Sequence, residues 1–76
     1  MQRQVNAGAI RAIRQGLGVE QAELARRADI SRFQMNRIEK GVVTPKIETL
    51  VRIARELGVS IDDIAPVITP EAAITS

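Results

Sequence analysis

Residues 21–41 read QAELARRADISRFQMNRIEKG and decide the fold, because two short helical patterns follow each other there almost without a gap. Apolar residues recur at helical spacing over residues 21–28 and again over residues 32–41, where Gly41 ends the second pattern. Only residues 29–31 separate the two patterns. Helices joined this closely cross at a steep angle, so we expect the second helix to project from the body of the protein.

The helix expected after this turn has an apolar face and a polar face. Ser31 followed three residues later by Gln34 has the form of a capping box, which marks where the helix begins. Met35 and Ile38 form its inward stripe, together with Ile30 of the turn. The residues that lie away from this stripe are expected on the open face: Arg32, Phe33, Asn36, Arg37 and Lys40.

Several of these outward residues suit a surface that reads bases in the major groove of DNA. An arginine donates two hydrogen bonds to guanine O6 and N7, an asparagine pairs with adenine, and an apolar group contacts the methyl of thymine. Arg32 and Phe33 fall in the first turn, the part of a recognition helix that reaches base edges. Two alternatives stay open: Phe33 folds back into the core, or Arg32 and Arg37 are ordinary solvated charges.

Three further helical patterns flank this pair. The first ends at a pair of glycines, the second lies between Pro45 and Gly58, and the third opens at Ser60, which forms a capping box with Asp63. No strand-like alternation persists, so the sequence predicts an all-α, compact five-helix bundle with a helix-turn-helix over residues 1–66. The core residues expected from these three helices are Ala9, Ile10, Ile13, Leu17, Ile47, Leu50, Ile53, Ala54, Leu57, Ile61 and Ile64.

Composition excludes several classes of function. A chain of 76 residues forms one domain at most. Because Cys and His are absent, disulfides, the usual zinc sites and the commonest general base are absent too. Asp62 and Asp63 are adjacent on a helix and diverge, and no glycine-rich phosphate loop occurs. We therefore predict no catalysis, no metal and no cofactor.

The distribution of charge is more informative than the net charge of +2. Residues 1–40 carry eight Arg or Lys against four Asp or Glu, whereas residues 41–76 carry three against five. A basic half beside an acidic half suggests a face that meets a polyanion, although an ordinary solvated surface is the alternative. No apolar run approaches the roughly 20 residues of a membrane span, and the N-terminal residues lack the apolar stretch of a signal peptide, so we expect a cytoplasmic protein.

Five stretches, in order, resemble the phage repressor/Cro-type (XRE) helix-turn-helix family. They are LGVEQAELA at 17–25, ISR at 30–32, NRIEKG at 36–41, PKIETL at 45–50 and IARELGVSIDDI at 53–64. The resemblance covers residues 9 to 65. It implies a five-helix DNA-binding domain that is usually homodimeric on a near-palindromic operator in double-stranded DNA. Family members are typically transcriptional repressors of phage, plasmid or bacterial genes.

The resemblance also implies roles for individual residues. Gln21 matches the family's glutamine that binds a backbone phosphate and braces the first recognition residue. Lys46 lies in the loop before the fourth helix, where a cation meets the DNA backbone. From the matched positions and the chemistry of the residues, we predict base reading by Arg32, Phe33, Asn36 and Arg37, and phosphate binding by Gln21, Ser31, Gln34, Lys40 and Lys46.

Three residues depart from the family pattern. Glu20 stands where Ser or Thr is favoured, which weakens the cap of the second helix and places a carboxylate near the DNA side. Asp29 replaces the common turn glycine, although Asp tolerates the left-handed conformation better than most residues. Phe33 occupies a slot that is usually small or polar, so the target sequence cannot be transferred from the family.

The C-terminal tail, residues 67–76, is more apolar than a disordered end requires. We predict that it helps two protomers to pair, and a frayed terminus is the alternative. Since a fold does not fix a function, a protein-interaction module such as an antitoxin or coactivator is the alternative to DNA binding. The apolar residues of the tail are Val67, Ile68, Ala72, Ala73 and Ile74.

Overall fold

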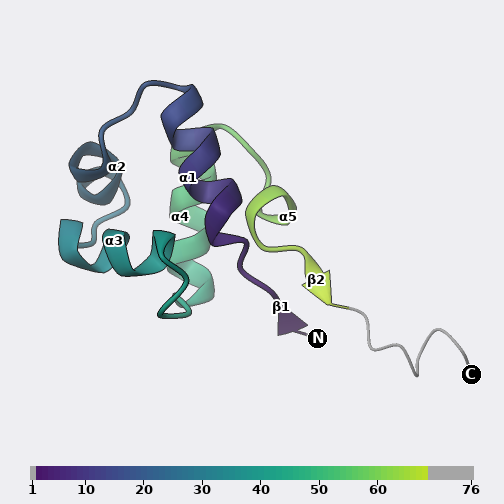
Figure 1. Ribbon diagram of the computed structural model, residues 1–76. Helices are drawn as coiled ribbons and strands as arrows, with labels where there is room; N and C mark the ends of the chain where they lie inside the picture. The colour runs from purple at the N-terminus through teal and green to yellow at the C-terminus, as the bar shows by residue number, and fades with distance from the viewer. Residues whose placement is uncertain (1, 69–76) are drawn as a thin grey trace, which may run out of the picture.

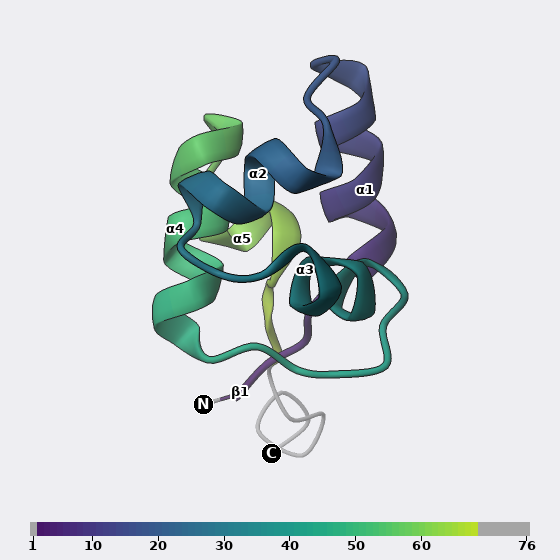
Figure 2. The same cartoon turned by 90° about the vertical axis from the view of Figure 1, so that its left-hand side faces the viewer.

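In the computed structural model, which describes residues 2–68, the chain folds into five helices and two short strands (Figure 1). Helices α2 and α3 lie together on one side of the molecule, α1 and α4 flank them, and α5 lies behind (Figure 2). This arrangement confirms the predicted five-helix bundle with its helix-turn-helix. The elements are β1 (Gln2–Arg3), α1 (Ala7–Gly16), α2 (Gln21–Arg27), α3 (Arg32–Glu39), α4 (Ile47–Leu57), α5 (Ile61–Ile64) and β2 (Val67–Ile68).

Side-chain caps set where several helices begin. The Ser31 hydroxyl accepts a hydrogen bond from the Gln34 backbone N–H at 3.0 Å, as the predicted cap of α3 requires. At α5 the Ser60 backbone N–H donates to the Asp63 carboxylate at 2.9 Å. Glu20 precedes α2 without a side-chain cap hydrogen bond, which confirms the weaker cap expected there. The cap of α1 is the Asn6 side chain, which sequence reasoning missed.

The turn between α2 and α3 depends on one unusual backbone conformation. Asp29 has a φ of 61°, in the left-handed region that residues other than glycine rarely adopt. The reversal of the chain lets the Ile30 N–H reach back to the Ala25 carbonyl at 2.9 Å, which satisfies a carbonyl at the end of α2. The structure thus confirms that an aspartate is tolerated in the left-handed conformation at this position. The turn sets the direction in which α3 leaves it.

The core is aliphatic and gathers residues from all five helices of the described chain. Two expected members are wrong: Leu17 is 55% exposed and Ile47 is 51% exposed, because both lie at helix ends where neighbouring helices no longer cover the apolar stripe. Ile13 and Ile61 are partly buried against the core rather than enclosed by it, and Ala9 is half-buried. The buried apolar residues are Ile10, Leu24, Ala25, Ala28, Met35, Ile38, Leu50, Ile53, Ala54, Leu57, Ile64 and Ala65.

The two strands join the beginning and the end of the described chain, which the sequence did not predict. Gln2 pairs with Ile68 and Arg3 with Val67 in an antiparallel ladder. Two-residue strands carry too little alternation to be recognised in a sequence. The first two residues of the predicted tail therefore pair within the chain. Its other apolar residues, Ala72, Ala73 and Ile74, lie outside the described residues.

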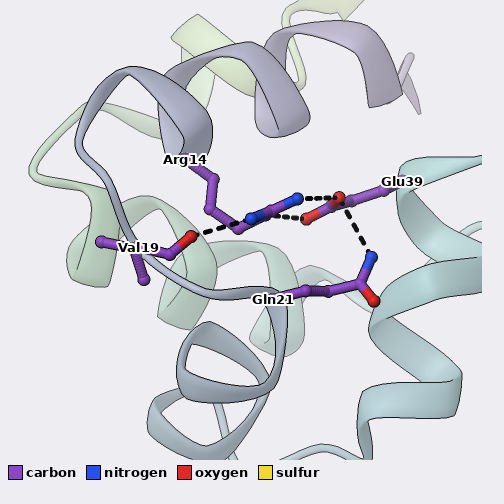
Figure 3. Close-up of polar contacts among 4 residues, drawn as sticks. All are labelled: Arg14, Val19, Gln21 and Glu39. Carbon is purple, nitrogen blue, oxygen red and sulfur yellow. Dashed lines mark hydrogen bonds and ion pairs between the residues drawn. The ribbon is translucent and has the colours of Figure 1, made fainter.

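A buried ion pair connects α1 to the end of α3 (Figure 3). Arg14 donates from Nε and Nη2 to the two carboxylate oxygens of Glu39, at 2.7 and 3.0 Å. A third donor of the same guanidinium, Nη1, reaches the Val19 carbonyl at 2.8 Å. The Arg14 and Glu39 side chains are only 11% and 3% exposed, and the hydrogen bond to Glu39 raises the pKa of Arg14 further above its ordinary value. Arg14 therefore carries its positive charge at any ordinary pH, and the Glu39 carboxylate is its partner in the ion pair.

None of the helices in the described part of the chain has the length and apolar character needed to cross a membrane.

We expect Glu39→Ala to lower the free energy of unfolding by about 3–5 kcal/mol, because it leaves a buried guanidinium without its countercharge. Urea denaturation followed by circular dichroism measures this loss. The matched control is the double variant Arg14→Met/Glu39→Leu, which removes both charges and should lose less than the single variant. Equal losses in the two variants would mean that packing, and not the ion pair, dominates at this position.

Candidate nucleic-acid interface

The outer face of α3 carries the side chains that the sequence assigned to base reading. Arg32, Phe33 and Arg37 are exposed, and Asn36 is half-buried. Phe33 is 70% exposed, so the alternative in which its ring folds back into the core is wrong. Met35 and Ile38 on the opposite face are fully buried, which holds α3 in place while its polar face stays open.

Two shallow hollows border α3, one on each side. The first, which we call the α1-side hollow, is lined by Arg11, Arg14, Glu20, Gln21, Arg32, Asn36, Glu39 and Lys40. The second, the loop-side hollow, is lined mainly by α3 and the segment before α4, with Ser31, Phe33, Gln34, Arg37, Lys46 and Arg52 among its residues. All nine residues predicted to contact DNA line one hollow or the other. The structure thus brings together residues from α2, α3 and the α3–α4 loop.

Five of the seven cations that line the two hollows have no charged partner among residues 2–68, whereas of the four cations elsewhere only Arg55 has none. Away from α3, Arg3 pairs with Asp62 at 2.7 Å, and Glu23 is bonded by both Arg26 and Arg27. The hydrogen bonds from Arg26 and Arg27 hold the pKa of Glu23 below its ordinary value. In contrast, five cations that line the hollows form no ion pair or hydrogen bond with residues 2–68: Arg11, Arg32, Arg37, Lys40 and Lys46.

Arg11 is the member of this group that sequence reasoning missed. It is exposed on α1 and lines the α1-side hollow together with Arg32 and Lys40 of α3. Nothing in the local pattern of α1 marks it, because its position matters only once α1 is packed beside α3. The available signal was its spacing of three residues from Arg14, which places both arginines near each other on one side of α1.

Gln21 lies at the junction between the buried ion pair and the α1-side hollow. Its amide Nε2 donates to Glu39 Oε1 at 3.2 Å, and the residue is half-buried (Figure 3). An amide nitrogen carries two hydrogens, so one remains for a ligand in the hollow after Glu39 is satisfied. Glu20 lines the same hollow, so the carboxylate expected near the DNA side is present there.

The chemistry of this surface is that of a polyanion site. Within residues 2–68, no three potential metal ligands come close enough together to hold a metal ion. Cations outnumber the carboxylates Glu20, Asp29, Glu39 and Glu48 along the hollows. The guanidinium, ammonium and amide groups there recognise phosphate and the edges of bases. A helix with an exposed outer face and donors on both of its sides has the chemistry needed to meet a groove bordered by phosphates.

Comparison with known proteins supports this interpretation. The helix-turn-helix family matches residues 10–64. No curated protein sequence matches the chain significantly. Among solved structures, the clp gene regulator ClgR from Corynebacterium glutamicum is 30% identical, with a TM-score of 0.73 over 75% of this chain and 61% of that one. The chain thus spans less than two thirds of the ClgR chain.

Two further similar structures contain DNA. The P22 c2 repressor in complex with a synthetic operator is 29% identical, with a TM-score of 0.72 over 78% of this chain and 89% of that chain. The biofilm regulator SinR in complex with DNA is 27% identical, with a TM-score of 0.68 over 72% of this chain and 89% of that chain. Because the family match spans most of the chain and the same five-helix fold recurs, the protein belongs to the helix-turn-helix family of DNA-binding regulators, of the phage-repressor (XRE) type.

Proposed function

We propose that this protein regulates transcription by binding a specific sequence in double-stranded DNA, with α3 in the major groove. The observation that carries the proposal is the set of five cations without carboxylate partners along the two hollows beside α3. A major groove has a phosphate backbone along each border. With α3 in the groove, the hollow on each side of the helix would face one of the two backbones. These cations can meet phosphates or base edges without first breaking an ion pair within the protein.

Base reading in this proposal falls to the outer face of α3. Arg32 and Arg37 supply planar donors for guanine, and Asn36 supplies an amide for adenine. Phe33 offers an apolar surface to thymine. The exposure of Phe33 supports this assignment, since a large apolar side chain in water is covered favourably by an apolar partner.

Phosphate binding falls to residues at the borders of the hollows. Gln21 and Lys40 lie on the α1 side, and Arg11 joins them there. Ser31, Gln34 and Lys46 lie on the loop side. Contacts of this kind fix the position of α3 on the duplex but carry no sequence information. Affinity therefore depends on both sides of α3, and specificity on its outer face.

The regulator is proposed to act in the cytoplasm as a homodimeric repressor on a near-palindromic operator, with residues 1–66 as its DNA-binding domain. The similar repressor and regulator structures that contain DNA support the DNA-binding part of this proposal. Two recognition helices in such a dimer lie about 34 Å apart, so that both face one side of the duplex. The tail from residue 67 onward is the proposed dimer contact.

We expect Lys46→Ala to weaken binding to all duplex sequences alike, because it removes a phosphate contact. The slope of log K against log salt concentration should become about 0.9 less steep. Fluorescence anisotropy between 50 and 200 mM salt measures the slope. The matched control is Arg55→Ala, since Arg55 is an exposed cation in the last turn of α4 and lines neither hollow. If the affinity of the wild-type protein for duplex DNA did not depend on salt concentration, a role as a protein-interaction module would be favoured instead.

We expect Arg37→Ala to cost about 1–3 kcal/mol of binding free energy and to relax the preference at one base pair. The reason is the loss of a bidentate donor to guanine. Selection of bound sites from a random DNA library, with wild-type protein and with the variant, gives both quantities. Unchanged affinity together with an unchanged preferred site would show that the outer face of α3 does not read DNA.

We expect removal of residues 69–76 to reduce self-association, as measured by sedimentation velocity. A chain that ends at Ile68 keeps the β1–β2 pairing, so loss of dimers would not reflect loss of that pairing. The control is the salt slope of DNA binding per half-site, which should not change. Dimers that persist at the same concentration would exclude residues 69–76 as the dimer contact.

A further inference from the structure

Phe33 and Arg37 form a cation–π pair on the exposed face of α3. The guanidinium carbon of Arg37 lies 5.4 Å from the centre of the Phe33 ring. Side chains on a helix lean toward its N-terminus, so a residue four positions later covers the ring of the preceding turn. A cation above an aromatic face at this distance is an attractive contact. The two side chains therefore restrict each other's positions before any ligand is bound.

The ring keeps most of its surface open despite this contact. Phe33 is the single aromatic residue of the chain, and it remains 70% exposed with Arg37 above it. It also lies in the first turn of α3, the part of a recognition helix that reaches base edges. An apolar surface in this position gains free energy from contact with another apolar group, and 5-methylpyrimidines present such a group in the major groove.

The contact with the ring leaves the hydrogen-bond donors of Arg37 without a partner among residues 2–68. The five N–H donors of arginine lie in the plane of the group, and Arg37 makes no hydrogen bond or ion pair with any residue from 2 to 68. The edge of the guanidinium fits O6 and N7 of guanine as a bidentate donor. The pair thus presents an apolar ring and a set of planar N–H donors next to each other on one face of α3.

We propose that Phe33 and Arg37 act as one unit that recognises a 5-methylpyrimidine next to a guanine in the major groove. The inference rests on the proposed function and names the base step that it requires. Phe33 covers the 5-methyl group, and Arg37 donates to the adjacent guanine. Thymine and 5-methylcytosine carry the same methyl group, whereas uracil and cytosine lack it, so the methyl can be removed without other changes to the base.

The experiment uses the full chain and an operator obtained by selection from random DNA. The guanine read by Arg37 is identified as the position of the operator at which the Arg37→Ala variant no longer prefers guanine. Replacing the neighbouring thymine by uracil should weaken binding about fourfold, the effect of one buried methyl group. If the T·A pair is replaced by C·G, adding a 5-methyl to that cytosine should strengthen binding by a similar factor. Unchanged affinity in both comparisons would overturn the proposal.

The variant Phe33→Ala separates a coupled pair from two independent readers. This variant should bind operators with uracil and with thymine equally well. Its preference for guanine should also fall, because Arg37 has lost its aromatic partner. Loss of the methyl effect with full retention of the guanine preference would overturn the coupling. Both side chains are exposed, so neither change disturbs the core. A wild-type chain that binds no DNA would contradict the proposed function itself, whereas DNA binding insensitive to the methyl contradicts this inference alone.

Discussion

The position of the recognition helix depends on one buried carboxylate. Glu39 is the last residue of α3, and it accepts hydrogen bonds from Arg14 of α1 and Gln21 of α2. Arg14 in turn holds the carbonyl of Val19 in the α1–α2 connection. Burying these charges is costly, and the paired hydrogen bonds offset the cost only when the geometry is good. Apolar contacts have no direction, so this network is what relates the orientation of α3 to both preceding elements.

The same residue types serve two different purposes in this molecule. Arg14 and Arg3 are satisfied by carboxylates and carbonyls, and their charges are used for folding. Arg32, Arg37 and Lys40 have no such partner among residues 2–68, and their charges remain for a ligand. The net charge of +2 does not reveal this division, because it sums paired and unpaired groups alike. For DNA binding, the distribution of unpaired cations matters more than their total.

Local rules were enough to locate the helices and the outer face of α3. Helical periodicity placed Met35 and Ile38 inside and Phe33 outside, and Ser31 marked the start of α3. The Arg14–Glu39 pair could not be found in this way, because its members are 25 residues apart and each resembles a solvated surface charge. Arg11 was missed for a related reason, since its role depends on the packing of α1 beside α3. The contact between Arg37 and the Phe33 ring could be recognised only from the side-chain conformations in the structure.

The pairing of β1 with β2 constrains the order in which the molecule forms during synthesis. Helices α2 and α3 are neighbours in the chain and can meet as soon as both have left the ribosome. The N-terminal segment, however, donates from Asn6 to the Ile64 carbonyl at 2.7 Å and from Gln4 to the Pro66 carbonyl at 3.0 Å. Contacts that span so much of a chain close late, because loop-closure entropy opposes them until the intervening parts are ordered. Residues 2–6 thus wait for residues 64–68 before they reach their final place.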